Sequence, residues 1–120
     1  VVMSACGDDD EPTYKSIYGK WEVYKYDFTF YDEQYGWRTQ SEYPYNEGYY
    51  EEYTFKRDHI YYYLYEDDRE MELFEGKFQY NNDFLILDNL MYSTWVMDDL
   101  LEMETTYQGQ TTHITLQRIN

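Results

Sequence analysis

Cysteine and alanine are nearly missing from this chain of 120 residues, since each occurs only once. A single cysteine, Cys6, excludes a disulfide bond within the chain. No window keeps apolar residues at the i, i+3, i+4, i+7 spacing of an amphipathic helix over three turns. Apolar runs are also short, and none approaches the roughly 18 residues of a membrane-spanning helix. The sequence therefore argues against a disulfide scaffold, a helical bundle and a helical membrane protein.

Basic residues are scarce. Nine Lys and Arg stand against 25 Asp and Glu, which gives a formal net charge of −16. Such a field repels phosphate backbones, so we expect no nucleic acid partner.

Motifs for catalysis and metal binding are missing as well. His59 and His113 are the only histidines, and the chain has no Gly-x-Ser-x-Gly, phosphate-binding loop or His-Glu-x-x-His pattern. Carboxylates are plentiful, but Asp67-Asp68 and Asp98-Asp99 lack the spacing of a calcium loop and suit turns instead. We therefore expect no enzyme activity, no cofactor and no metal site.

Aromatic residues, in contrast, make up 22% of the chain, and 18 of them are tyrosines, which suit a half-buried pleated sheet. Alternation along residues 60–65 predicts a strand with two distinct faces. One face holds Ile60, Tyr62 and Leu64, and the other holds Tyr61, Tyr63 and Tyr65.

The same pattern predicts about eight short strands separated by turn residues. They are Gly19 to about Phe30, Tyr50–Lys56, His59–Glu66, Arg69–Phe74 with a kink at Gly76 before Phe78 and Tyr80, Phe84–Leu87, Thr94–Met97, Leu101–Tyr107 and Thr111–Arg118. In the first strand the apolar face changes parity, which predicts a bulge near Tyr24. A polar loop is expected through Gly36, Pro44 and Gly48, and the strongest turn signal is Asn81-Asn82-Asp83. Closely spaced strands with short turns predict an all-β, up-and-down antiparallel barrel.

The N-terminal residues Met3-Ser4-Ala5-Cys6 resemble the lipobox of bacterial lipoproteins. This resemblance implies that residues 1–5 are a signal-peptide remnant, that Cys6 carries the lipid, and that residues 6–16 tether a domain at 17–120. The acidic run Asp8, Asp9 and Asp10 resembles the export signal of surface-exposed lipoproteins. The expected location is the cell envelope, with the protein held on the outer membrane by its lipid and exposed at the cell surface.

Gly19-Lys20-Trp21 at the start of the first strand resembles the Gly-x-Trp motif of lipocalins, and Arg118 resembles the arginine that packs on that tryptophan. The resemblance implies a small lipocalin-like barrel whose base is closed by a cation–π contact. The C-terminal pattern Trp95-x-Met97-x-x-Leu100-Leu101-x-Met103 is similar to that of short lipocalin-like domains of envelope lipoproteins. The chain departs from typical lipocalins in lacking a Thr-Asp-Tyr motif, a C-terminal helix pattern and a cysteine pair.

Two binding modes follow for this non-enzymatic domain. In the first, the barrel holds a small apolar or amphipathic ligand in a cup lined by Tyr62, Leu64, Phe78 and Met103. In the second, the outer residues Tyr61, Tyr63 and Tyr65 contact a glycan or a protein. Each mode has a structural alternative: large inward side chains can fill the barrel, and tyrosines can simply pair across strands.

Overall fold

Nine antiparallel strands and one short helix form the part of the chain that the structure describes. The structure is a computed structural model, and it describes residues 16–57, 59–67 and 69–119. In chain order the elements are β2 (Gly19–Asp32), β3 (Gly36–Glu42), α1 (Pro44–Glu47), β4 (Tyr50–Lys56), β5 (His59–Glu66), β6 (Arg69–Tyr80), β7 (Phe84–Leu87), β8 (Leu90–Met97), β9 (Leu100–Tyr107) and β10 (Gln110–Arg118).

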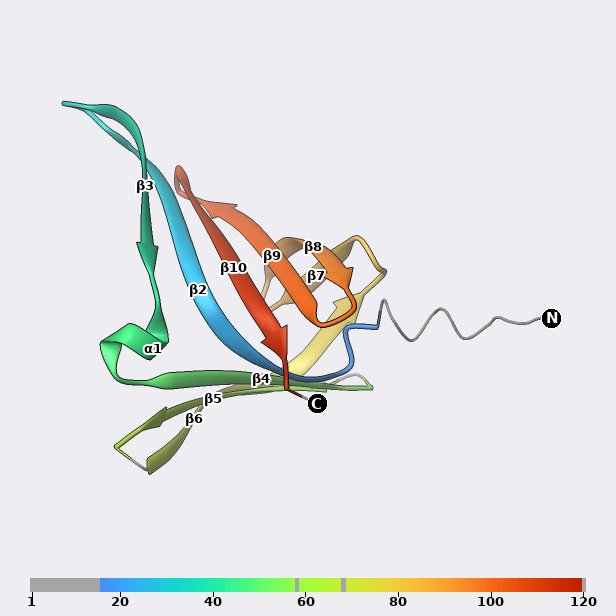
Figure 1. Ribbon diagram of the computed structural model, residues 1–120. Coiled ribbons are helices and arrows are strands. Elements are labelled where there is room, and N and C mark those ends of the chain that lie inside the picture. The colour runs from blue at the N-terminus through green and yellow to red at the C-terminus, as the bar shows by residue number, and fades with distance from the viewer. Residues whose placement is uncertain (1–15, 58, 68, 120) are drawn as a thin grey trace.

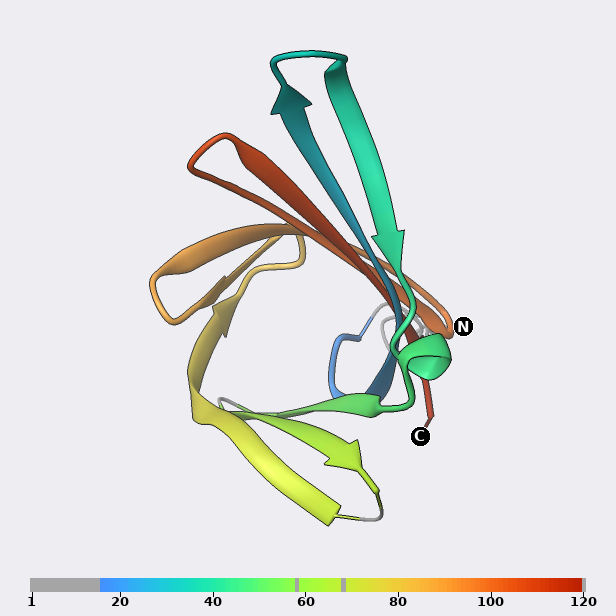
Figure 2. The same ribbon diagram turned by 90° about the vertical axis from the view of Figure 1, so that its left-hand side faces the viewer.

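Eight of these strands close into an up-and-down barrel. From β4 to β10 each strand pairs with the next, β2 pairs with β4, and β10 returns to pair with β2. Figure 1 shows β2, β10 and β9 side by side, with β4, β5 and β6 crossing beneath them, and Figure 2 looks into the ring of strands. The predicted all-β, lipocalin-like barrel of about eight strands is confirmed.

The ninth strand, β3, lies where the sequence analysis expected a loop. β2 pairs with β4 only from Gly19 to Glu22, and its second half, from Tyr26 to Asp32, pairs with β3 instead. The residues of β3 are mostly polar and exposed, so they lack the alternation that marks a half-buried strand. The strand forms because β2 is 14 residues long and offers a free edge beyond its contact with β4.

The sequence predicts an irregularity in each of two strands, and the structure has a register shift in both. Thr115 pairs with Lys25 and Leu116 with Val23, so Tyr24 is skipped and the predicted bulge is confirmed. In β6 the register shifts between Phe74 and Glu72, so Leu73 is skipped, and Gly76, where the sequence predicts a kink, lies within the same continuous strand. A Cβ at position 76 would lie 3.0 Å from the tip of the Phe74 ring, so any other residue there requires that ring to shift.

The strongest turn signal of the sequence, Asn81-Asn82-Asp83, forms a turn in the structure. The Asn81 side chain accepts hydrogen bonds from the backbone N–H groups of Asp83 and Phe84, at 3.1 and 2.9 Å. Asn82 adopts a φ of 81°, a conformation that asparagine tolerates better than most residues. The turn before β7 is therefore stabilised by hydrogen bonds within its own few residues, and the Thr94 N–H adds one to the carbonyl of Asp83 at 2.9 Å.

The base of the barrel is closed around Trp21, which is fully buried. Its indole N–H donates to the carbonyl of Ile17 at 2.8 Å, and the Arg118 guanidinium carbon lies 4.2 Å from the centroid of its ring. Arg118 also donates to the carbonyls of Ser16 and Tyr18 at 2.8 and 2.9 Å. The contact expected between Arg118 and Trp21 is thus present, and Gly19, at a φ of 122°, begins the strand that carries the tryptophan.

The interior next to this base is filled by apolar side chains from nearly every strand. The fully buried members besides Trp21 are Ile17, Phe55, Ile60, Leu85, Leu101, Met103 and Leu116. Trp95, in contrast, is 47% exposed and lies over the imidazole of His113 on the outside of the barrel.

Candidate functional site

The four residues expected to line a cup lie on inner strand faces but differ in their access to solvent. Phe78 and Met103 are 7% and 0% exposed and belong to the packed core. Tyr62 packs against that core, and Leu64 is half-buried on the same face of β5. Tyr62 and Leu64 are therefore less deeply buried than Phe78 and Met103, which are covered by their neighbours.

A buried carboxylate, which the sequence analysis did not single out, lies beside Tyr62. Glu51 on β4 is 5% exposed and accepts hydrogen bonds from the hydroxyls of Tyr26 on β2 and Tyr62 on β5, the latter at 2.5 Å. Backbone pairing between β2 and β4 ends at Glu22, so the bond from Tyr26 to Glu51 links the two strands just beyond the point where they separate. The Glu51 cluster, meaning Glu51 with Tyr26 and Tyr62, is a polar cross-link inside the barrel.

The electrostatics of the Glu51 cluster keep its tyrosines protonated. Burial, followed by the neighbouring Tyr53 and Glu51, raises the pKa of Tyr26 far above its usual range. Burial and the hydrogen bond to Glu51 raise the pKa of Tyr62, whose ring stacks on Tyr53 at a centroid distance of 4.5 Å. The hydroxyls remain hydrogen-bond donors at neutral pH, which suits a structural tie and not proton transfer.

The outer face of β5 carries a row of three tyrosines, Tyr61, Tyr63 and Tyr65. Consecutive ring centroids are 6.5 and 6.3 Å apart, and all three side chains are half-buried. They line a hollow of about 460 Å³, which we call the tyrosine groove. Its other lining residues are Lys20, Glu52, Thr54, Lys56 and Glu70.

Polar side chains of the tyrosine groove hold one another in place. The Glu52 side chain, only 10% exposed, accepts hydrogen bonds from the hydroxyls of Tyr50 and Thr54 at 3.2 and 3.4 Å. The ammonium of Lys20 lies 3.9 Å from the same carboxylate. The ammonium of Lys56 lies 5.8 Å from the ring centroid of Tyr61. Aromatic faces and a mixture of donors and acceptors therefore share one open surface.

The tyrosine trio was predicted from strand parity, but its polar neighbours were not. The β4–β5 hairpin pairs Thr54 with Tyr61 and Glu52 with Tyr63. That register follows from the short turn between the strands, so the signal for Thr54 and Glu52 was present in the sequence. Lys20 could not be predicted from the sequence, because it joins the groove only when β2 pairs with β4.

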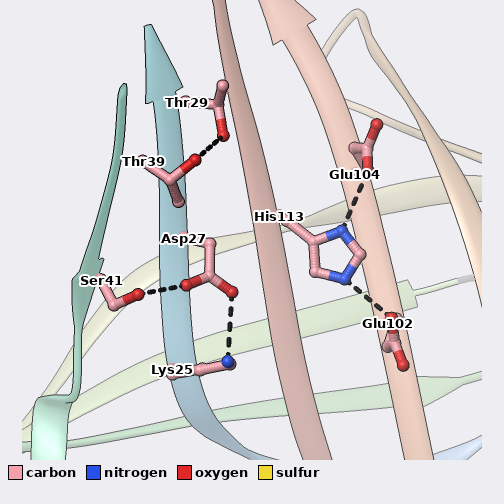
Figure 3. Close-up of polar contacts among 8 residues, drawn as sticks. All are labelled: Lys25, Asp27, Thr29, Thr39, Ser41, Glu102, Glu104 and His113. Carbon is pink, nitrogen blue, oxygen red and sulfur yellow. Dashed lines mark hydrogen bonds and ion pairs between the residues drawn. The ribbon is translucent and has the colours of Figure 1, made fainter. Parts of the chain in front are cut away.

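A second polar cluster lies on the outer surface of β3, β2, β10 and β9 (Figure 3). The imidazole of His113 contacts the carboxylates of Glu102 and Glu104, at 2.8 and 2.9 Å, through its two nitrogens. On the neighbouring strands the Ser41 hydroxyl donates to Asp27, and Lys25 lies 3.4 Å from the same carboxylate. Desolvation lowers the pKa of His113, but the hydrogen bonds to Glu104 and Glu102 outweigh it and raise the pKa. With both nitrogens engaged by carboxylates, this imidazole offers no free nitrogen for base catalysis.

The remaining predictions concern the N-terminal residues, metal ions and membrane-spanning helices. Cys6, Asp8, Asp9 and Asp10 fall outside the described residues. Within the residues that are described, no three His, Cys, Asp or Glu side chains are arranged to hold a metal ion, and no helix is both long and apolar enough to span a membrane. No protein-family model, curated protein or solved structure matches the chain.

Proposed function

We propose that this barrel is a non-enzymatic binding module that contacts a glycan through the tyrosine groove. The observation that carries the proposal is the row formed by Tyr61, Tyr63 and Tyr65 in an open hollow with polar side chains along it. Tyrosine rings bury apolar area at a low cost in conformational entropy while their hydroxyls stay hydrated. The apolar face of a sugar ring and its hydroxyls match those two properties.

The structure favours this mode over the cup. Two of the four cup candidates, Phe78 and Met103, are packed within the core. The hydroxyl of a third, Tyr62, is already bonded to Glu51. A ligand in the cup would have to displace these contacts, whereas the tyrosine groove is open as it stands.

We propose further that the module is a lipoprotein of the cell envelope, anchored through Cys6. The support is the pattern Met3-Ser4-Ala5-Cys6 followed by Asp8, Asp9 and Asp10. Each buried CH₂ of an acyl chain contributes about 0.8 kcal/mol to membrane attachment, so more than one chain gives a stable anchor.

The anchor is tested by fatty-acid labelling in a Gram-negative host. Cys6→Ala should abolish incorporation of the labelled acid and leave unprocessed precursor. Replacing Asp8, Asp9 and Asp10 with Ala should keep acylation but reduce protease accessibility on whole cells. Normal labelling of Cys6→Ala would rule out the anchor, and unchanged accessibility of the triple variant would rule out the export role.

The groove is tested by affinity electrophoresis of the full chain in gels containing neutral polysaccharides. Tyr63→Ala should weaken retention about tenfold, equivalent to about 1.4 kcal/mol. Tyr31→Ala is the matched control, because Tyr31 is 59% exposed and lies at the far end of β2, away from the groove.

Two results would overturn the proposal in favour of one of its rivals. Saturable binding of an apolar dye that Leu64→Ala weakens and Tyr63→Ala does not would favour the cup. A protein partner whose binding depends on Tyr63, with no retention on any polysaccharide, would replace the glycan.

A further inference from the structure

We infer that the binding surface extends from the tyrosine groove into two adjoining hollows, so that the ligand is a chain of several neutral sugar units. This inference rests on the proposed glycan-binding function and adds the class and length of the ligand. The three hollows together form what we call the tyrosine track.

The first extension begins where the groove ends. A hollow of about 530 Å³ is lined by Tyr65 and Glu70, which also line the tyrosine groove, and by Tyr45, Tyr49 and Tyr50. The ring of Tyr50 lies 5.2 Å from that of Tyr65, centroid to centroid, so the aromatic surface continues from one hollow to the next. The shared residues make these two hollows neighbours on one surface.

The second extension lies on the other side of Tyr45. This residue is 84% exposed and also lines a hollow of about 430 Å³ together with Tyr24 and Tyr43, whose rings meet edge to face at 5.6 Å. The amides of Asn46 and Gln117 line the same hollow. Tyr45 therefore connects the two extensions as Tyr65 connects the first extension with the groove.

Two irregular features of the fold build this end of the track. α1 begins at Pro44, which is buried, and is capped after Glu47 by Gly48 with a φ of 87°, so Tyr45 lies between two fixed points. Tyr24 is the bulged residue of β2, and a bulge re-aims the side chain that it carries. Figures 1 and 2 both place α1 at the end of the barrel where β5 finishes, which is also where Tyr65 lies.

The charges on the track favour a neutral chain as its occupant. The protein carries a net charge of −16, which repels polyanions such as acidic polysaccharides. Glu52, the most buried carboxylate of the track, is already engaged by Lys20, Tyr50 and Thr54, and the ammonium groups of Lys20 and Lys56 disfavour a cationic peptide in the groove. Glu22, Asp67 and Glu70 also line the track. Together with the amides, phenol hydroxyls and lysines they supply both donors and acceptors, and each sugar hydroxyl uses both.

The test is a length series of neutral oligosaccharides, from disaccharide to hexasaccharide, cut from the polysaccharide that retains the protein best. Isothermal titration of the full chain should show affinity rising with length. Tyr63→Ala should weaken binding of every member. Tyr45→Ala should weaken the hexasaccharide about tenfold and leave the disaccharide unchanged.

Controls separate this inference from the function on which it rests. Tyr31→Ala should behave as the unmodified protein at every length, and Asn46→Ala should follow Tyr45→Ala, because both side chains line the second extension. Affinity that stays flat with length, or a hexasaccharide indifferent to both Tyr45→Ala and Asn46→Ala, would overturn the extended track while the groove stands. Failure of every oligosaccharide to bind, or binding of oligolysine that requires Tyr45, would overturn the glycan itself.

Discussion

At the scale of single residues, Glu51 presents the clearest energetic problem. A carboxylate that is 5% exposed has lost most of its hydration, and the hydroxyls of Tyr26 and Tyr62 replace it. Hydrogen bonds to a charged group contribute about 1.5–3 kcal/mol each, and a buried charge without partners is costly. The Glu51 cluster therefore stabilises the barrel only while all its members are present.

We expect Tyr26→Phe and Tyr62→Phe each to lower the free energy of unfolding by about 1.5–3 kcal/mol, because each leaves the Glu51 carboxylate with one donor fewer. Since both hydroxyls bond the same oxygen, the two changes should not be additive. Urea denaturation of the single and double variants measures the coupling. Additive losses would mean that the two bonds act independently.

His113 should make stability depend on pH. Its folded pKa is raised above the ordinary value of 6.5 by Glu104 and Glu102, against the opposing effect of desolvation. Protonation therefore favours the folded state, and this stabilisation is complete below pH 6.5 and is lost as the pH rises through the folded pKa. His113→Gln should remove that part of the pH profile. If the free energies of unfolding of the two proteins change in parallel across this pH range, His113 does not make this contribution to stability.

At the scale of elements, the strand pairings show what the sequence could and could not predict. Eight strands and the turn after Asn81 follow from alternation and turn chemistry, which act over a few residues. β3 was missed because its pairing depends on the free half of β2 and not on its own residues. Glu51 was missed for the same kind of reason, since its partners lie 25 and 11 residues away in the chain.

The contact between Trp21 on the first strand and Arg118 on the last predicts that substitutions at the two positions lower stability by different amounts. Trp21→Ala should cost about 3–5 kcal/mol as a truncation in the core. Arg118→Ala should cost less, about 0.5–2 kcal/mol, through the cation–π contact and the hydrogen bonds to Ser16 and Tyr18. Arg118→Lys should lie between Arg118→Ala and the unmodified protein, because lysine keeps the charge but not the planar donors. Chemical denaturation followed by circular dichroism ranks the variants, and equal losses for Arg118→Ala and Trp21→Ala would contradict this order.

At the scale of the whole molecule, the buried tyrosines make the stability of the barrel depend on pH in the alkaline range. Burial is the largest cause that raises the pKa of Tyr26 and Tyr53, with neighbouring tyrosines and Glu51 adding to it. In the unfolded chain both hydroxyls titrate near the ordinary value of 10.0. The unfolded state therefore binds fewer protons than the folded state above that pH, and stability falls by about 1.4 kcal/mol per pH unit for each such proton.

We therefore expect cooperative alkaline unfolding, in which tyrosinate absorbance from the buried residues appears together with the loss of the β-sheet circular dichroism signal. Tyr26→Phe removes one of the coupled protons, so its unfolding free energy should fall less steeply with pH above about pH 10 than that of the unmodified protein, by about 1.4 kcal/mol per pH unit. Denaturant titrations at several pH values in this range give both slopes. Complete ionisation of all 18 tyrosines in a chain that keeps its β-sheet signal would show that the interior is open to hydroxide, and the assignment of Tyr26 and Tyr53 as buried donors would fail.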